Sequence, residues 1–217
     1  MRIGIEAGLR ERVRLGVLEI EGIEPGADIP AFDRELDRVA ERLRARFGAA
    51  DPAQDPRVAA VRSLFRSLGI DPTKRRPSSE ALLRRILQNK PLSRIHPLVD
   101  ACNLLSLELL LPIGLYDLDR IEPPVELRLG REGESYAGIG RETIHFAGRG
   151  ALCDIQGPFG SPISDSERTK VRTETERALW VIFGPAALSS AELQTAIDRC
   201  AGFLRPYAGD IEYAQVT

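Results

Sequence analysis

Aromatic, sulfur-containing and histidine side chains are scarce in this chain of 217 residues. Aromatic residues make up 6% of it, and it contains three cysteines, two histidines, one tryptophan and one methionine. No two cysteines have the Cys-x-x-Cys spacing of a zinc site, and His96 and His145 are far apart, so we expect no bound metal. The sequence also lacks a phosphate-binding glycine loop and the Gly-x-Ser-x-Gly turn of α/β-hydrolases, and we expect no cofactor.

Long apolar runs are absent as well. No stretch approaches the ~18 consecutive apolar residues of a membrane helix, and the charged N-terminus, with Arg2, Glu6 and Arg10, lacks the apolar core of a signal peptide. These absences argue against a membrane protein and predict a location in the cytoplasm. With 43% hydrophobic and 29% charged residues, the chain can bury the core of one domain.

The spacing of apolar residues predicts an order in which most helices precede most strands. The expected helices lie at 31–47, 58–68, 98–111 and 190–204, with a further helix that Ser78 or Ser79 caps and with Ser190 as the cap of the last one. The expected strands lie at 13–20, 125–129, 135–139, 143–146, 151–155 and 179–183. This segregation indicates an α+β fold with a mixed or antiparallel sheet packed against helices. The loop at 48–56 divides an N-terminal strand and helix element (1–55) from a main domain (56–217).

Three polar residues interrupt the apolar helix expected at 98–111. Asp100, Asn103 and Glu108 would each cost a few kcal/mol if buried without a partner, so they either hold loops in place or line a pocket. Pro112 and Gly114 then end the helix, and we expect Tyr116 to lie in the loop that follows, together with Asp117 and Asp119.

This segment resembles the B3/B4 domain in the β subunit of bacterial phenylalanyl-tRNA synthetase. The pattern of that domain is approximately Val-Asp-x-x-Asn, then Leu-Glu-Leu-x-x-Pro-x-His-Ala-Phe-Asp-x-Asp. The matching positions are Val99, Asp100, Asn103, Leu107, Glu108, Leu109, Pro112, Tyr116, Asp117 and Asp119. The chain looks still more like the free-standing B3/B4 proteins, which share the segment at 76–86, and the resemblance runs from about residue 61 to about residue 204.

The resemblance implies an editing pocket. In the synthetase the domain hydrolyses tyrosine wrongly attached to the phenylalanine tRNA, and a pocket that hydrogen-bonds a phenol hydroxyl rejects the analogue that lacks it. A loop with Gly, Ser, Asp and Thr closes one side of that pocket, and the segment 157–166 is comparable here. The pocket residues that the resemblance implies are Asp100, Asn103, Glu108, Gly114, Tyr116, Gly157, Ser161 and Asp165.

One position departs from the family pattern. Gly114 stands where the pattern has a histidine that belongs to the editing pocket, and Leu115 replaces the neighbouring alanine. Hydrolysis of an aminoacyl ester needs a positioned water and a stabilised oxyanion, so it does not strictly require that histidine. No catalytic residue is assigned from the sequence.

A basic segment lies upstream of this region. Between residues 57 and 94 there are ten basic residues and two acidic ones, although the whole chain has a net charge of −2. Such a segment is a candidate surface for RNA phosphates, and the alternative is a solvated helix surface, because aromatic residues for base stacking are absent there. The phosphate-binding candidates are Arg62, Arg66, Lys74, Arg75, Arg76, Arg84 and Arg85.

His96 has two interpretations. It lies four residues before Asp100, so the carboxylate could orient the imidazole as a general base. The alternative is a structural histidine at the entrance of the helix.

Two functions remain open from the sequence. The first is a tRNA-binding trans-editing hydrolase of mischarged aminoacyl-tRNA, and the second is a noncatalytic module that binds RNA or a small amino-acid-like ligand. The chain has no recognisable ATP-binding motif and is too short for a synthetase catalytic core, so we expect no aminoacyl-tRNA ligase activity.

Overall fold

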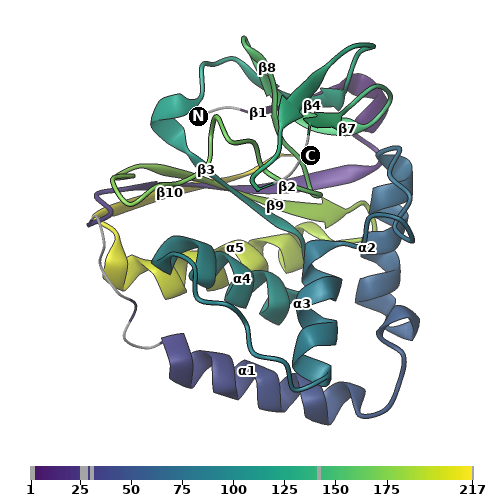
Figure 1. Cartoon of the computed structure of the whole chain (residues 1–217), viewed down its shortest axis with the longest axis vertical. Coiled ribbons are helices and arrows are strands. Elements are labelled where there is room, and N and C mark those ends of the chain that lie inside the picture. The colour runs from purple at the N-terminus through teal and green to yellow at the C-terminus, as the bar shows by residue number, and fades with distance from the viewer. Residues whose placement is uncertain (1–2, 25–28, 30–31, 141–142, 217) are drawn as a thin grey trace.

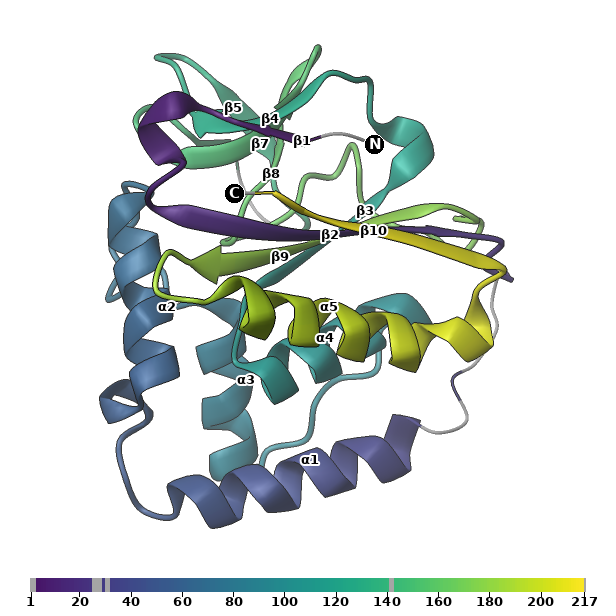
Figure 2. The same cartoon turned by 180° about the vertical axis from the view of Figure 1, so that it is seen from behind.

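Two four-stranded sheets lie one above the other, and the α-helices cover the outer face of one of them (Figures 1 and 2). The structure is a computed structural model, and it describes residues 3–24, 29, 32–140 and 143–216. The arrangement is the α+β fold that the sequence predicts, with a mixed sheet, an antiparallel sheet and helices. One apolar core extends through the helices and both sheets, because each amphipathic layer must bury its apolar face against the next.

The sheet next to the helices is antiparallel and has the order β10-β2-β9-β3. Its strands are β10 (Asp210–Val216), β2 (Val13–Glu21), β9 (Ala178–Pro185) and β3 (Ile113–Asp117). The strands predicted at 13–20 and 179–183 are confirmed as β2 and β9, and every residue of β9 is buried. Strand β2 lies between β10 and β9, so the predicted N-terminal element contributes a central strand to this sheet.

The second sheet is mixed and has the order β1-β4-β7-β8. It consists of β1 (Ile3–Ile5), β4 (Val125–Leu129), β7 (Gly150–Asp154) and β8 (Gly157–Gly160), with β1 parallel to β4. Beside it lies the hairpin of β5 (Ser135–Ala137) and β6 (Thr143–His145). The four strands predicted between 125 and 155 are present within two residues of their predicted ends. The prediction of a loop at 157–166 is wrong for its first four residues, because these form β8 and pair with β7.

Five α-helices are described: α1 (Phe32–Phe47), α2 (Pro56–Ser67), α3 (Ser78–Leu87), α4 (Pro97–Leu109) and α5 (Ser190–Leu204). Short 3-10 turns occur at Ala7–Leu9, Pro52–Gln54, Leu118–Arg120 and Arg205–Tyr207. The predicted caps are wrong. Helix α5 is capped by Ser189 in a capping box with Glu192, and the N-cap of α3 is Pro77, with no side-chain hydrogen bond.

The chain leaves α4 through a tight turn that leads directly into β3. Leu110 adopts a left-handed conformation with φ of 55°, and the Ser106 hydroxyl donates to the Leu111 carbonyl at 2.7 Å. Strand β3 then begins at Ile113. Tyr116 and Asp117 therefore lie in a buried strand and not in the loop that we expected, because β3 pairs with the apolar strand β9. Only Asp119 lies beyond it, in a 3-10 turn.

Candidate functional site

A cavity of about 410 Å³ opens between α4, β3 and the loop 161–165 that follows β8. Helix α4 contributes Val99, Cys102, Asn103 and Ser106, and β3 contributes Ile113 and Leu115. Two isoleucines at its border, Ile95 and Ile139, are 71% and 42% exposed. A mainly apolar cavity with a few polar groups is typical of a small-molecule site, and this volume lies near the lower end of the roughly 300–1,000 Å³ range of such sites.

Asp165 is the acidic residue of this cavity. The residue as a whole is partly exposed, whereas its carboxyl group is surrounded by protein. Burial raises the pKa of this carboxyl to about 7, although the Tyr116 hydroxyl and the Leu115 backbone N–H act in the opposite direction. Its backbone is fixed, since the Asp165 carbonyl accepts from the Ile139 N–H at 3.2 Å. A carboxyl that is half ionised near neutral pH is suited to proton transfer.

Tyr116 lies directly behind Asp165 and is completely buried. Its ring packs edge to face on Phe159, with centroids 5.1 Å apart. Its hydroxyl faces Asp165 but completes no hydrogen bond within the described part of the chain. Space for this hydroxyl depends on two glycines, because a Cβ on Gly114 would lie 2.1 Å from the oxygen and one on Gly160 would lie 2.4 Å from it. Gly114 is thus buried against Tyr116, where a histidine side chain would not fit.

Asn103 and Ser161 also line the cavity. The Asn103 amide makes no hydrogen bond to the residues that the structure describes, so it is free to bind a ligand. Ser161 Oγ donates to the Ser164 carbonyl at 3.2 Å and lies 3.3 Å from the Tyr136 hydroxyl, which shapes the loop 161–165. Of the eight pocket residues that the resemblance implies, the structure brings Asn103, Ser161 and Asp165 to the cavity wall and places Tyr116 and Gly114 behind it.

The other three lie elsewhere. Both oxygens of Asp100 are used by the loop before α4, where Arg94 Nε donates at 2.9 Å and the Ile95 N–H donates at 2.9 Å. Gly157 lines a different cavity, of about 740 Å³, beside β4 and β7.

Glu108 also points away from the cavity. It pairs with Arg38 and Arg42 of α1 and with Arg199 of α5, at 3.2, 3.2 and 2.7 Å. Its side chain thus joins three helices, and its burial has a structural explanation.

His96 does not form the base that we considered. Its Nδ1 accepts the Leu98 N–H at 3.3 Å as the N-cap of α4, while Asp100 is occupied by Arg94 and Ile95. A neutral ring with an accepting Nδ1 carries its proton on Nε2, and this nitrogen is buried with no partner in the described residues. The position favours a structural role for His96.

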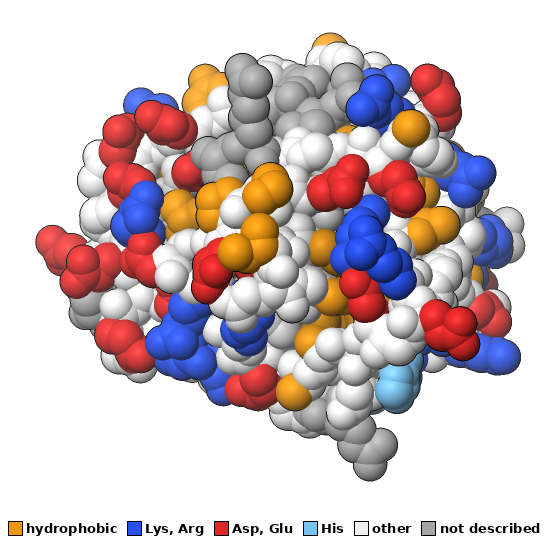
Figure 3. Space-filling view, turned by 90° about the horizontal axis from the view of Figure 1, so that it is seen from above, with side chains coloured by type: hydrophobic (Ala, Val, Ile, Leu, Met, Phe, Trp, Pro, Cys, Tyr) orange, Lys and Arg blue, Asp and Glu red, His pale blue; other side chains and the backbone are white. Residues whose placement is uncertain are grey.

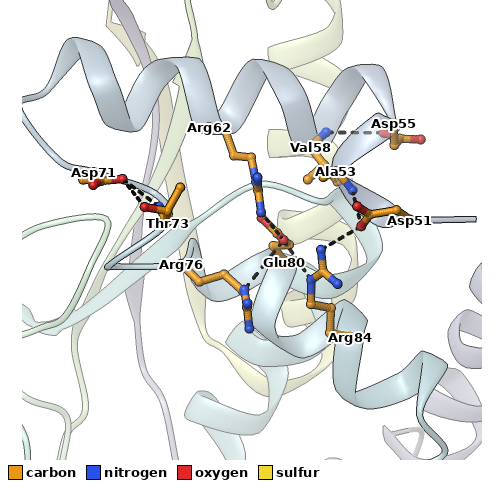
Figure 4. A network of polar contacts seen from close by, with 10 residues as sticks. All are labelled: Asp51, Ala53, Asp55, Val58, Arg62, Asp71, Thr73, Arg76, Glu80 and Arg84. Carbon is orange, nitrogen blue, oxygen red and sulfur yellow. Dashed lines mark hydrogen bonds and ion pairs between the residues drawn. The ribbon is translucent and has the colours of Figure 1, made fainter.

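Much of the basic segment is paired with acidic residues. Glu80, 1% exposed, accepts two hydrogen bonds from Arg62 at 2.7 and 2.8 Å and one from Arg84 at 2.9 Å, and Arg76 lies 3.7 Å away (Figure 4). Arg84 also pairs with Asp51 at 2.8 Å. These arginines therefore fix α2, α3 and the turn before α2 to one another.

The remaining basic candidates are exposed. Arg66, Lys74 and Arg75 form no salt bridge within the described chain, although Lys74 lies near Asp71, and the Arg85 side chain donates to the Pro91 carbonyl. The segment with Lys74 and Arg75 leads directly to Ser78, which lines the cavity. On the face beside β4, β7 and β8, acidic, basic and hydrophobic side chains are intermixed (Figure 3). Of the seven basic candidates, Arg66, Lys74, Arg75 and Arg85 are thus the ones that no salt bridge holds in the described residues.

The cavity residues that sequence reasoning missed are mostly apolar. Ile95, Ile139, Ile163 and Val171 come from four separate segments, and only the exposure of the first two distinguishes them from core residues. Lys170 also lines the cavity and pairs with Glu167 at 2.5 Å.

No group of three or more His, Cys, Asp or Glu that could hold a metal occurs in the described residues. None of the helices described is long and apolar enough to cross a bilayer.

Comparison with known proteins identifies the family to which this chain belongs. The family model of the B3/4 domain matches residues 60–209, and the chain therefore belongs to the B3/4 domain family. Among solved structures, it is similar to an N-terminal fragment of the phenylalanyl-tRNA synthetase β-subunit from Pyrococcus horikoshii, with a TM-score of 0.50 and 15% identity. The match covers 99% of this chain and 54% of that one, so the chain spans about half the length of that fragment. No curated protein sequence matches.

Proposed function

We propose that this B3/4 domain protein hydrolyses the ester bond of a mischarged aminoacyl-tRNA. The observation that carries the proposal is Asp165, a carboxyl with a pKa of about 7 in a cavity of amino-acid size. Membership of the B3/4 family supports it, because this domain kind also occurs in a tRNA synthetase subunit of similar fold.

In the proposed reaction, Asp165 acts as the general base. Its carboxylate accepts a proton from a water molecule while the water oxygen attacks the ester carbonyl carbon. The bond from that carbon to the ribose oxygen breaks, and the proton passes to the ribose oxygen. The products are the free amino acid and the RNA with its terminal hydroxyl restored. Asn103 is placed to hold the aminoacyl group by a hydrogen bond from its free amide.

The exposed basic residues near α3 give the RNA a place to bind. Lys74 and Arg75 precede Ser78 at the cavity border, so phosphates bound there would bring the aminoacyl end to the cavity. Arg62 and Arg84 contribute less, because Glu80 already pairs with them. We expect Lys74→Glu with Arg75→Glu to weaken RNA binding and to reduce its salt dependence.

The test is deacylation of a panel of labelled aminoacyl-tRNAs that includes tyrosyl-tRNA of the phenylalanine acceptor. We expect selective deacylation that rises with pH through about 7 and falls at least ~100-fold in Asp165→Asn. Asn103→Ala should reduce the selectivity among amino acids. The matched control is Glu174→Gln, which removes an exposed carboxylate nine residues further along the chain. Equal rates in the wild type and Asp165→Asn would refute the role of the carboxyl.

A noncatalytic amino-acid-binding module is the second candidate. The close approach of the buried Tyr116 hydroxyl to Gly114 favours this function. Gly114 stands where the synthetase pattern has its pocket histidine, and the hydroxyl leaves no room for a side chain at that position. This function predicts saturable binding of an amino acid or of its ester, lost in Asn103→Ala, with no deacylation of any member of the panel.

A further inference from the structure

The hydroxyl of Tyr116 has no use in the packing of the core. The ring is fully buried and already fixed by its edge-to-face contact with Phe159, and a phenylalanine would make the same contact. Burying a hydroxyl without a completed hydrogen bond is unfavourable, and this one lacks such a bond in the described residues.

The surrounding backbone makes room for this oxygen at two glycines. Gly114 of β3 and Gly160 of β8 both lie close to it, and a Cβ on either would overlap the hydroxyl, at 2.1 and 2.4 Å. The oxygen faces the carboxyl of Asp165, whose own backbone forms a bridge with Gly160. Strands β3 and β8 and the loop with Asp165 thus place the buried Tyr116 hydroxyl next to the Asp165 carboxyl.

We propose that Tyr116 is a positioning residue, which donates a hydrogen bond from its hydroxyl to the ionised carboxylate of Asp165 and so fixes the oxygen that accepts the proton from water. As a role in hydrolysis, this inference rests on the proposed function. Tyr116 does not contact the substrate, because its hydroxyl lies behind the cavity wall.

Other titratable groups around Asp165 do not replace this contact. Tyr136 of β5 is turned to Ser161 and to the Ser164 carbonyl, and Cys102 of α4 is a buried thiol whose pKa is raised by burial. His96 and Lys170 share the cavity, but His96 caps α4 and Lys170 pairs with Glu167. No cation pairs with Asp165 among the described residues.

The sign of the effect follows from the donor. A hydroxyl that donates to a carboxylate stabilises the ionised form and lowers the pKa, so its removal raises the pKa. We expect Tyr116→Phe to raise the titration midpoint of Asp165 by about one pH unit, which is the size of one hydrogen bond to a charged group. Below the midpoint, the ionised fraction and the deacylation rate should fall about tenfold, while the rate at high pH falls less.

The experiment follows the Asp165 carboxyl directly, by NMR titration of protein labelled with ¹³C at aspartate side chains. The control is Tyr136→Phe, which removes a neighbouring buried hydroxyl that contacts Ser161 and the Ser164 carbonyl but keeps the donor at Asp165, and which should shift the midpoint much less than Tyr116→Phe does. In wild-type protein labelled at tyrosine Cζ, the Tyr116 signal should move with the same midpoint as Asp165. This second measurement keeps the test valid if Tyr116→Phe does not fold.

The outcomes separate this inference from the proposed function. A raised midpoint in Tyr116→Phe supports the positioning role even if no aminoacyl-tRNA is hydrolysed. An unchanged or lowered midpoint, or a Tyr116 signal that does not follow Asp165, overturns it even if the wild type deacylates its substrate with a pH dependence near 7.

Discussion

Removing the buried carboxyl of Asp165 should stabilise the protein, and by more at higher pH. The folded state holds the Asp165 proton more tightly than the unfolded chain does, because its pKa rises from the ordinary 3.8 to about 7. A carboxyl with a raised pKa has no effect on stability below its unfolded pKa. It lowers stability progressively as pH rises from about 4 to about 7, and the loss is constant above that.

The magnitude follows from the size of the shift. About three pKa units correspond to a loss of about 4 kcal/mol at about pH 8, of which roughly 1.5 kcal/mol is already present at about pH 5. Asp165→Asn keeps the shape and hydrogen-bonding capacity of the side chain but does not ionise. Its gain in unfolding free energy over the wild type should therefore be larger at about pH 8 than at about pH 5, by roughly 2–3 kcal/mol.

Urea unfolding of both proteins at the two pH values measures this difference, and other titrating groups cancel in the comparison. Glu174→Gln, an exposed change in the same part of the chain, should show no such pH dependence. If Asp165→Asn changes stability equally at both pH values, Asp165 titrates in its ordinary range and the proposed general base is wrong. The combination of higher stability and lost hydrolysis would instead mark Asp165 as a residue kept for function.

Three further predictions concern other contacts. Glu80→Gln should lower the unfolding free energy by about 2–3 kcal/mol, which is less than for a fully buried ion pair because Arg62 is 20% exposed. Urea unfolding measures this loss, and a loss under about 0.5 kcal/mol would show that the ion pairs of Glu80 contribute little to stability. Since hydrogen bonds from the arginines lower the pKa of Glu80 despite its burial, the wild-type advantage should disappear as pH falls below the ordinary value of 4.5. Gly114→Ala should lower the unfolding free energy by about 1–3 kcal/mol, because the new methyl group overlaps the Tyr116 hydroxyl. In a double-mutant cycle the loss should be smaller in the Tyr116→Phe background, and additive effects would argue against this overlap. Arg75→Glu should weaken RNA binding with little loss of stability. Filter binding at several salt concentrations measures the affinity, and an unchanged affinity would show that Arg75 does not contact RNA.

The regular elements were predictable because their apolar patterns are local. Strand β4 at Val125–Leu129 matches its prediction, and α5 differs only in which serine caps it. Strand β3 was missed, since it follows a helix breaker and carries Gly114 and Tyr116, which also suit a turn. Its pairing with β9, far away in the sequence, decides its structure, and no local pattern contains that information.

The candidate site shows the same limit. Asp100 and Glu108 are residue types that suit a polar pocket, but the fold brings arginines to them instead. Arg94 pairs with Asp100, and Arg38 and Arg199 pair with Glu108. Asp165 attracted attention in the sequence only as a member of a polar loop. Its distinctive property, a carboxyl enclosed without a cation among the described residues, depends on how β8 and β3 bring the loop against Tyr116.

The position of β2 has a consequence for synthesis of the protein. Translation makes this strand before α1, α2, α3 and α4, whereas its two neighbours, β9 and β10, come only after these helices and after β4 to β8. During translation β2 therefore stays without partners while all of these intervening segments are made, exposing an apolar strand with free backbone groups on both edges. Closing a sheet from such distant segments is slow, so we expect the newborn chain to depend on chaperones more than a helical protein of equal length does.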